Sequence, residues 1–269
     1  MTVARVITRS VADVVEQLEL DGDTVVTINR LAGVMRQLGL SGDPRRLAYE
    51  LQRDGWLGNL RTRHAWEFLP GARGGRYGSG DRFIEFRAQQ AVNATWPGVL
   101  AMESAASVLG LAQRVPEQEV VALAEGEPFP KALTGRWRYV RIHISEEGIA
   151  SINGLRTWDR EGLIVGVAVR PSSYKDVAGL GQWMSASVYE ADIEKIIRLL
   201  QPMTAAARQR AAYLLWASEN LGGAERIVAA YPPTATAWLG PRQPGGRYEP
   251  LTKVSDTLVH NYLSVGNGS

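Results

Sequence analysis

The fold of this chain is decided by residues 27–70, which have the sequence TINRLAGVMRQLGLSGDPRRLAYELQRDGWLGNLRTRHAWEFLP. In the first part, apolar residues recur at helical spacing, Thr27 can cap the helix and Gly39 can end it. A second helix is predicted from Pro44 to about Asp54, because Asp43 places a capping side chain directly before a proline at the first helical position. The segment therefore begins with two short helices joined by a turn.

The predicted helix over residues 44–54 has two different faces. Apolar side chains at three- and four-residue spacing fall on one side, and we expect that side to pack inward. They are Leu47, Ala48 and Leu51. The opposite side carries the basic residues Arg45, Arg46 and Arg53 together with Tyr49. The sequence therefore predicts a helix with a buried apolar face and an exposed basic face.

Residues 56–69 alternate apolar and polar side chains on both sides of a polar tip that contains Arg61 and Arg63, as a hairpin does. Before the two helices, residues 10–20 form an amphipathic pattern and predict another helix. Its expected inward residues are Val11, Val14, Val15 and Leu18. Three helices followed by a hairpin predict a winged helix-turn-helix domain.

This arrangement favours DNA binding, because helix-turn-helix proteins place the second helix in the major groove, where arginine pairs with phosphates or guanine edges. Residues 45–63 contain five arginines against two acids, Glu50 and Asp54. The alternative is that these arginines only solvate the outer face of a surface helix. The candidate DNA-binding residues are Arg30, Arg45, Arg46, Tyr49, Arg53, Arg61 and Arg63.

Composition narrows the remaining possibilities. The chain has 269 residues, 45% of them hydrophobic and 22% charged, as in ordinary globular proteins. It contains no cysteine, so disulfides and zinc–cysteine sites are excluded, and a cytoplasmic location is expected. No apolar run is long enough to span a bilayer, so we expect no membrane partner. Because the net charge is only +2, nucleic-acid affinity must come from local clusters.

The glycine-rich segment 70–80 predicts a linker, which gives a winged helix-turn-helix domain over residues 1–75 and a larger mixed α/β domain over 76–269. The expected fold class is α/β in the α+β sense. Helices are predicted over 83–93, 98–110, 178–188, 190–200 and 204–220, and strands over 119–124, 137–144 and around Trp238 and Tyr248. Residues 155–170 fit a buried strand or a helix capped at Thr157, and their spacing favours the helix.

We expect no catalytic, metal-binding or cofactor-binding site. The three histidines, His64, His143 and His260, are isolated and lack metal-ligand spacing. The carboxylate pairs 159/161 and 192/194 are two residues apart, and on a helix such side chains diverge. A metal-dependent nuclease is the third hypothesis, with Glu194 and Lys195 as its only candidate residues.

The order of these parts resembles the AbiEi-type antitoxins of bacterial AbiE toxin–antitoxin systems, including their mycobacterial MenA-type relatives. The resemblance rests on the N-terminal winged unit with residues 53–57 leading into the wing, and on segments 104–111, 160–173 and 208–215. At the wing the sequence differs from the plainest family pattern, because His64-Ala65-Trp66 stands in place of a glycine-bearing turn.

The resemblance implies a non-enzymatic antitoxin whose N-terminal domain binds inverted repeats in its own promoter and represses its operon. It also implies that the C-terminal domain counters a partner toxin of nucleotidyltransferase fold. The family's DNA-contacting face then falls on Arg45, Arg46 and Arg53. The alternative function is a stand-alone winged-helix transcriptional regulator whose second domain senses a ligand or binds a protein.

Overall fold

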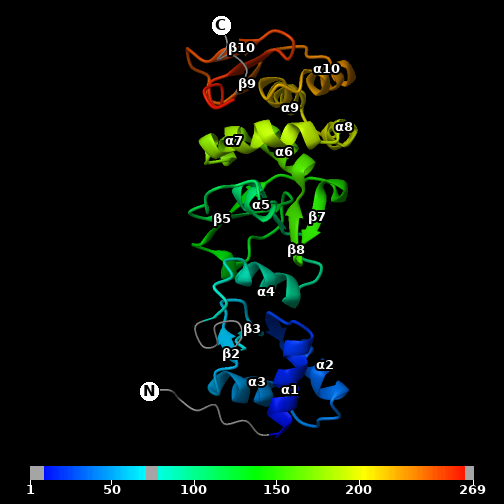
Figure 1. Cartoon of the computed structure of the whole chain (residues 1–269), viewed down its shortest axis with the longest axis vertical. Coiled ribbons are helices and arrows are strands. Elements are labelled where there is room, and N and C mark those ends of the chain that lie inside the picture. Colours follow the sequence, from blue (N-terminus) through cyan, green and yellow to red (C-terminus); the bar gives the residue numbers. More distant parts are fainter. Residues whose placement is uncertain (1–8, 71–77, 264–269) are drawn as a thin grey trace. The chain divides into compact units, whose positions relative to one another are not determined.

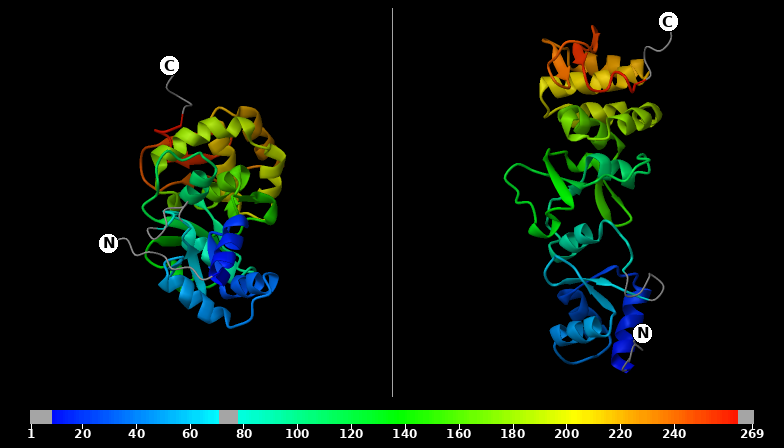
Figure 2. Two further views of the ribbon diagram at one scale, coloured as in Figure 1. Left: turned by 60° about the horizontal axis from the view of Figure 1, so that its bottom comes forward. Right: turned by 90° about the vertical axis from the view of Figure 1, so that its left-hand side faces the viewer.

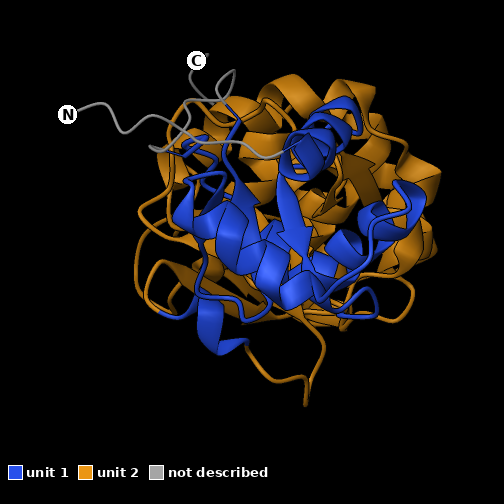
Figure 3. Cartoon of the chain, turned by 90° about the horizontal axis from the view of Figure 1, so that it is seen from below, with its two compact units in different colours: residues 1–96, 130–134 blue, residues 97–129, 135–269 orange. Residues whose placement is uncertain are grey.

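The structure is a computed structural model that describes residues 9–70 and 78–263. The chain has a mixed α/β fold and forms two compact units, which Figure 3 shows in two colours. Unit 1 contains residues 1–96 and 130–134, and unit 2 contains residues 97–129 and 135–269. Most of the predicted glycine-rich linker, residues 71–77, lies outside the described residues. No helix in the described part of the chain combines the length and apolar character needed to cross a membrane.

Unit 1 begins with the elements that the sequence predicts, and adds one short strand (Figure 1). The elements are α1 (Arg9–Leu20), β1 (Val25–Thr27), α2 (Ile28–Gln37), α3 (Pro44–Arg53), β2 (Leu57–Asn59), β3 (Ala65–Phe68) and α4 (Ile84–Val92). The three strands form an antiparallel sheet in the order β1-β3-β2, with β3 in the centre. Strand β1 was not predicted, because three residues are too few to show an alternating pattern.

The helix boundaries in unit 1 follow from their caps. The Thr27 side chain accepts a hydrogen bond from the backbone N–H of Arg30 at 3.1 Å, and Asp43 accepts one from the N–H of Arg45 at 2.9 Å. Both predicted caps are confirmed. The core that these helices share is apolar, and the four inward residues predicted for α1 are all buried in it.

Unit 1 extends beyond the boundary that the sequence predicts. Helix α4 packs against β1 and β3, and the short segment 130–134 packs against α4. Phe86 of α4 is fully buried, and its ring meets that of Trp96 edge to face at 5.2 Å between centroids. The division therefore falls after Trp96 rather than after residue 75. A glycine-rich segment indicates a loop, but it does not indicate which of the two units the following helix α4 belongs to.

Unit 2 contains two sheets and the remaining helices of the described chain. Its elements are β4 (Val99–Leu100), α5 (Met102–Val108), β5 (Glu119–Leu123), β6 (Trp137–Arg141), β7 (Ile149–Ile152), β8 (Leu155–Trp158), α6 (Arg160–Val169), α7 (Val177–Ser187), α8 (Ile193–Leu200), α9 (Ala205–Ala217), α10 (Leu221–Ala230), β9 (Ala237–Leu239), β10 (Arg247–Glu249) and β11 (Val254–Asp256). The larger sheet is mixed and has the order β6-β5-β4-β8-β7. The smaller sheet has the order β10-β11-β9.

The elements of unit 2 lie in layers, which Figures 1 and 2 show from different sides. The five-stranded sheet is followed by a layer of α6, α7 and α8, and then by α9 and α10. Helix α9 packs on α6 through one side and on the small sheet through β9 and β11. Because α6 and α9 both lie between other layers, most of their residues are buried.

Two predicted helices of unit 2 start later than expected. The segment after Pro97 first pairs as strand β4, and the residues from 155 to 158 form strand β8 before α6 begins. The preference for helix over all of 155–170 was therefore wrong at its start, and the cap of α6 is Asp159 rather than Thr157. Thr157 is fully buried in the sheet. A four-residue strand beside a ten-residue helix cannot be separated from it by periodicity alone.

Candidate nucleic-acid interface

Helix α3 exposes the basic face that its sequence predicts. Ala48 and Leu51 are buried in the core of unit 1, and Leu47 packs against that core. The opposite side presents the residues predicted to bind DNA. They are Arg45, Arg46, Tyr49 and Arg53, all of which are exposed. The faces follow directly from the helical spacing of the sequence.

Two of these arginines already have acidic neighbours. Arg46 pairs with Glu50 at 3.2 Å, and Arg53 pairs with Asp54 at 2.8 Å, which raises the pKa of Arg53 through the hydrogen bond. The side chains of Arg46 and Arg53 are 82% and 62% exposed. Ion pairs this exposed are screened by solvent and contribute little to stability. Both guanidinium groups can therefore exchange these partners for phosphate at little cost.

Arg45 lines a recess of about 270 Å³ in unit 1. The recess is lined by Thr27, Ile28, Asn29, Arg45, His64, Ala91 and Val92. It brings together the start of α2, the start of α3 and the β2–β3 hairpin, which we call the wing. Asn29 and His64 are both exposed, and each carries groups that can donate hydrogen bonds to a phosphate or a base edge. Neither residue is among the candidates that the sequence pattern identifies.

The turn of the wing is made by His64. Its φ is 63°, in the left-handed region that favours glycine, so the histidine takes the place of the expected glycine. Its carbonyl accepts a hydrogen bond from the N–H of Ile28 at 3.3 Å, which ties the wing to the start of α2. The hairpin therefore closes without a glycine, and Arg63 lies exposed next to the turn.

Glu85 of α4 holds the other side of the wing tip. Its carboxylate accepts hydrogen bonds from the N–H of Arg61 at 2.6 Å, from the N–H of Thr62 at 3.2 Å and from the hydroxyl of Thr62 at 3.0 Å. The Arg61 guanidinium is also occupied, because it donates to the carbonyl of Thr134 at 2.6 Å. Arg61 therefore fixes the wing, while Arg63 lies exposed beside the turn.

We expect Glu85→Ala to loosen the wing tip. Because the carboxylate accepts three hydrogen bonds, its loss should destabilise unit 1 by about 2 kcal/mol. Amide hydrogen exchange at residues 61 and 62 should accelerate, and this measurement reports the anchor directly. Glu16→Ala on α1 is the matched control, since Glu16 is exposed and the change in charge is the same. Equal exchange rates in both variants would contradict the anchoring role.

Arg30 lies in a different environment from the other candidates. Its guanidinium donates to Asp23 at 2.7 and 2.9 Å and also pairs with Asp21. The hydrogen bond to Asp23 is the main reason that the pKa of Arg30 is raised. Its charge is balanced locally by two carboxylates, so we leave Arg30 out of the interface proposed below.

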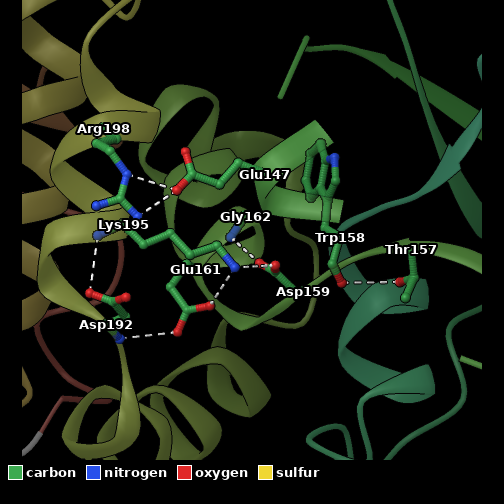
Figure 4. A network of polar contacts seen from close by, with 9 residues as sticks. All are labelled: Glu147, Thr157, Trp158, Asp159, Glu161, Gly162, Asp192, Lys195 and Arg198. Atoms are coloured by element: carbon green, nitrogen blue, oxygen red, sulfur yellow. Dashed lines mark hydrogen bonds and ion pairs between the residues drawn. The ribbon is translucent and has the colours of Figure 1, made fainter. Parts of the chain in front are cut away.

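The carboxylates of Asp159 and Glu161 do not diverge as expected. Both contact the ammonium group of Lys195, at 2.6 and 3.4 Å (Figure 4). Asp159 is the N-cap of α6 and has extended backbone angles, so the rule for two helical residues does not apply to it. Glu161 also accepts the N–H of Asp192 at 3.2 Å, at the start of α8. The cluster joins the N-terminal ends of α6 and α8.

The contacts of Lys195 do not favour a role as a general base. Burial is the largest single influence on Lys195 and lowers its pKa, but the contacts with Asp159 and Glu161 together outweigh it and raise the pKa. The lysine is therefore held in its charged form. Glu194, the other residue of the nuclease hypothesis, pairs with Arg226 instead. The side chains of Glu194 and Lys195 therefore contact different partners.

Three arginines lie on or beside strand β6. Arg138 donates to Glu103 at 2.6 Å and to the carbonyl of Ser173 at 2.8 Å. Arg141 donates to the carbonyls of Ala124 and Glu127. Both guanidinium groups therefore hold loops of unit 2 in place. The third arginine, at position 136, is exposed.

Models of known protein families give no match to this chain, and comparison with curated proteins gives none either. Among solved structures, the chain is similar to the crystal structure of the RV2827C protein from Mycobacterium tuberculosis, with 25% sequence identity and a TM-score of 0.76. The similarity covers 95% of this chain and 94% of that chain. It therefore extends over both units, and the mixed α/β architecture of this chain is shared with that protein.

Proposed function

We propose that unit 1 is a winged helix-turn-helix domain that binds double-stranded DNA through α3 and the β2–β3 wing. The observation that carries the proposal is the exposed face of α3 with Arg45, Arg46, Tyr49 and Arg53. The order helix–strand–helix–helix–strand–strand supports it, since a winged domain inserts its third helix into the major groove and sets the hairpin beside it. Asn29, His64 and Arg63 extend the same surface toward the wing.

We further propose that the protein is an antitoxin of the AbiEi type, which represses its own operon and counters a nucleotidyltransferase-like toxin. The support is the resemblance of the sequence segments described above, together with a fold in which unit 2 has its own core. In this proposal unit 1 contacts the promoter and unit 2 counters the toxin. The protein is then a binding protein rather than an enzyme.

The operator should contain an inverted repeat upstream of the protein's own gene. A single winged unit reads a short half-site, and sufficient specificity requires two such sites one or more helical turns apart. DNase footprinting on the promoter should therefore show two protected half-sites of opposite orientation. Protection of a single asymmetric site would contradict this arrangement.

The antitoxin function can be tested separately from DNA binding. The full chain, expressed from an unrelated promoter, should restore growth to cells that express the neighbouring nucleotidyltransferase gene. The variant Arg45→Glu, Arg46→Glu should restore growth equally well, because both positions lie on the outer face of unit 1. Failure of both proteins to restore growth would favour the stand-alone regulator.

A further inference from the structure

Unit 2 contains a recess of its own. Its lining residues are far in the sequence from those of the proposed DNA-binding surface. It has a volume of about 660 Å³, within the range of sites for small ligands. Its lining residues come from the segment after α6, from α9 and from the β9 region, and include Arg170, Lys175 and Arg210. Neither an aspartate nor a glutamate is among the described residues that line it. The recess therefore combines three cations with no anion.

Arg210 is the most unusual of these cations. It is half-buried, and its Nε donates to the carbonyl of Trp238 at 2.6 Å while Nη1 donates to the carbonyls of Ala168 and Val169 at 3.3 and 3.4 Å. These partners are neutral. Burial alone lowers the pKa of Arg210, with no carboxylate acting against it. Among the described residues, the contacts of Arg210 are to neutral carbonyl groups and not to a carboxylate.

A purely structural role explains only part of this arrangement. Arg210 lies at the C-terminal end of α6, where a cation interacts favourably with the helix dipole and with the last carbonyls. That role uses Nε and Nη1. It does not use Nη2, which takes part in none of these three hydrogen bonds. It also does not require two further cations beside Arg210.

The neighbours of Arg210 extend the positive charge across the recess. Arg170 and Lys175 are both exposed, and the Lys175 ammonium rests on the carbonyl of Ser172 at 2.9 Å. Lys175 also lines a neighbouring recess of unit 2. That recess differs in its charges because Glu103, Glu117 and Asp176 line it. The recess around Arg210 differs from this neighbouring recess in having no acid among its described lining residues.

The rest of the lining is apolar and aromatic. Trp238 is half-buried, and it lines the recess with Val169, Val177, Pro241 and Leu258. Guanidinium groups bind phosphate oxygens, often with two parallel hydrogen bonds, and an indole or aliphatic wall accepts a flat ring. A nucleotide joins these two properties in one molecule, with phosphates at one end and a base at the other.

We propose that this recess binds a nucleotide, with its phosphates on Arg170 and Arg210 and its base against the apolar wall that includes Trp238. Titration calorimetry of the full chain with ATP should show binding that weakens as salt increases, since the phosphates contribute charge. Pyrophosphate, which lacks the base, should bind more weakly than ATP. Adenosine, which lacks the phosphates, should bind weakest. Absence of ATP binding would overturn the proposal, and pyrophosphate binding as tight as that of ATP would overturn the assignment to a nucleotide.

Variants locate the site. Arg170→Glu should lower the affinity for ATP roughly tenfold or more, because it removes a charged hydrogen bond and adds repulsion. Arg136→Glu is the matched control, since Arg136 is exposed, lies outside the recess and undergoes the same change of charge. Arg210→Gln should have a similar effect to Arg170→Glu. If Arg210→Gln fails to fold, Arg170→Glu alone decides the result.

A further experiment tests whether the recess binds free nucleotides or nucleic acid. The affinity for a short DNA duplex should be equal in the wild type and in Arg170→Glu, because duplex binding is assigned to unit 1. ATP affinity that is unchanged in Arg170→Glu would overturn the proposal. The proposal would also be overturned if the wild type does not bind ATP and Arg170→Glu binds the duplex more weakly. The recess would then bind the backbone phosphates of DNA.

Discussion

The double variant Arg45→Glu, Arg46→Glu should bind duplex DNA about 100-fold more weakly than the wild type, because each lost arginine contact costs about 1.4 kcal/mol. The salt dependence should also become shallower by about one unit in the slope of log K against log salt for each lost phosphate contact. Since both side chains are exposed, the fold should be unchanged. Mobility-shift titrations at several salt concentrations measure the affinity and the slope together.

The control for this variant is Arg136→Glu, Arg226→Glu, which changes the net charge equally in unit 2. Both of these arginines are exposed, and Arg226 pairs only with an exposed partner, Glu194. The control should retain nearly all of the DNA affinity, because the affinity comes from a local cluster. Equal losses in the two double variants would mean that general charge, and not the face of α3, governs binding.

A large effect on stability is expected from Gly162→Ala in α6. A Cβ at this position would lie 2.2 Å from the carbonyl oxygen of Gly148, which is backbone and cannot rotate away. The Gly162 N–H also donates to the capping Asp159 at 2.8 Å, so a shift of the helix would disturb the contact of Asp159 with Lys195. We expect a loss of about 3 kcal/mol or more, and a melting temperature lowered by roughly 10 °C.

Gly222→Ala provides the comparison within unit 2. Gly222 lies in α10, and a Cβ there would meet nothing within 4 Å. Because alanine favours helix over glycine, this variant should be more stable than the wild type by about 0.5–1 kcal/mol. Thermal unfolding followed by circular dichroism gives both values. Similar melting temperatures for the two variants would show that α6 adjusts to the extra methyl group.

The local features of unit 1 could be predicted from the sequence because each depends on neighbouring residues. Thr27 and Asp43 cap their helices through hydrogen bonds that span two or three residues. The faces of α1 and α3 follow from helical spacing. Helical spacing and the positions of the arginines are therefore sufficient to locate the basic surface of α3.

Other features depend on contacts between distant parts of the chain. Glu85 reaches the wing across more than 20 residues, and Lys195 reaches Asp159 across more than 30. No local pattern distinguishes Glu85 from any other acid on an amphipathic helix. The same is true of Arg210, whose lack of an acidic partner becomes visible only when α6, α9 and β9 are placed together.

The central claim is that α3 and the wing contact DNA, and photochemical cross-linking tests it most directly. Promoter duplexes that carry 5-bromouracil in each half-site should cross-link to peptides of the full chain, which mass spectrometry then identifies. We predict cross-links within residues 44–64, with Tyr49 as the main acceptor because its exposed ring lies on the basic face. Cross-links confined to unit 2, on a duplex that the protein binds specifically, would contradict the account.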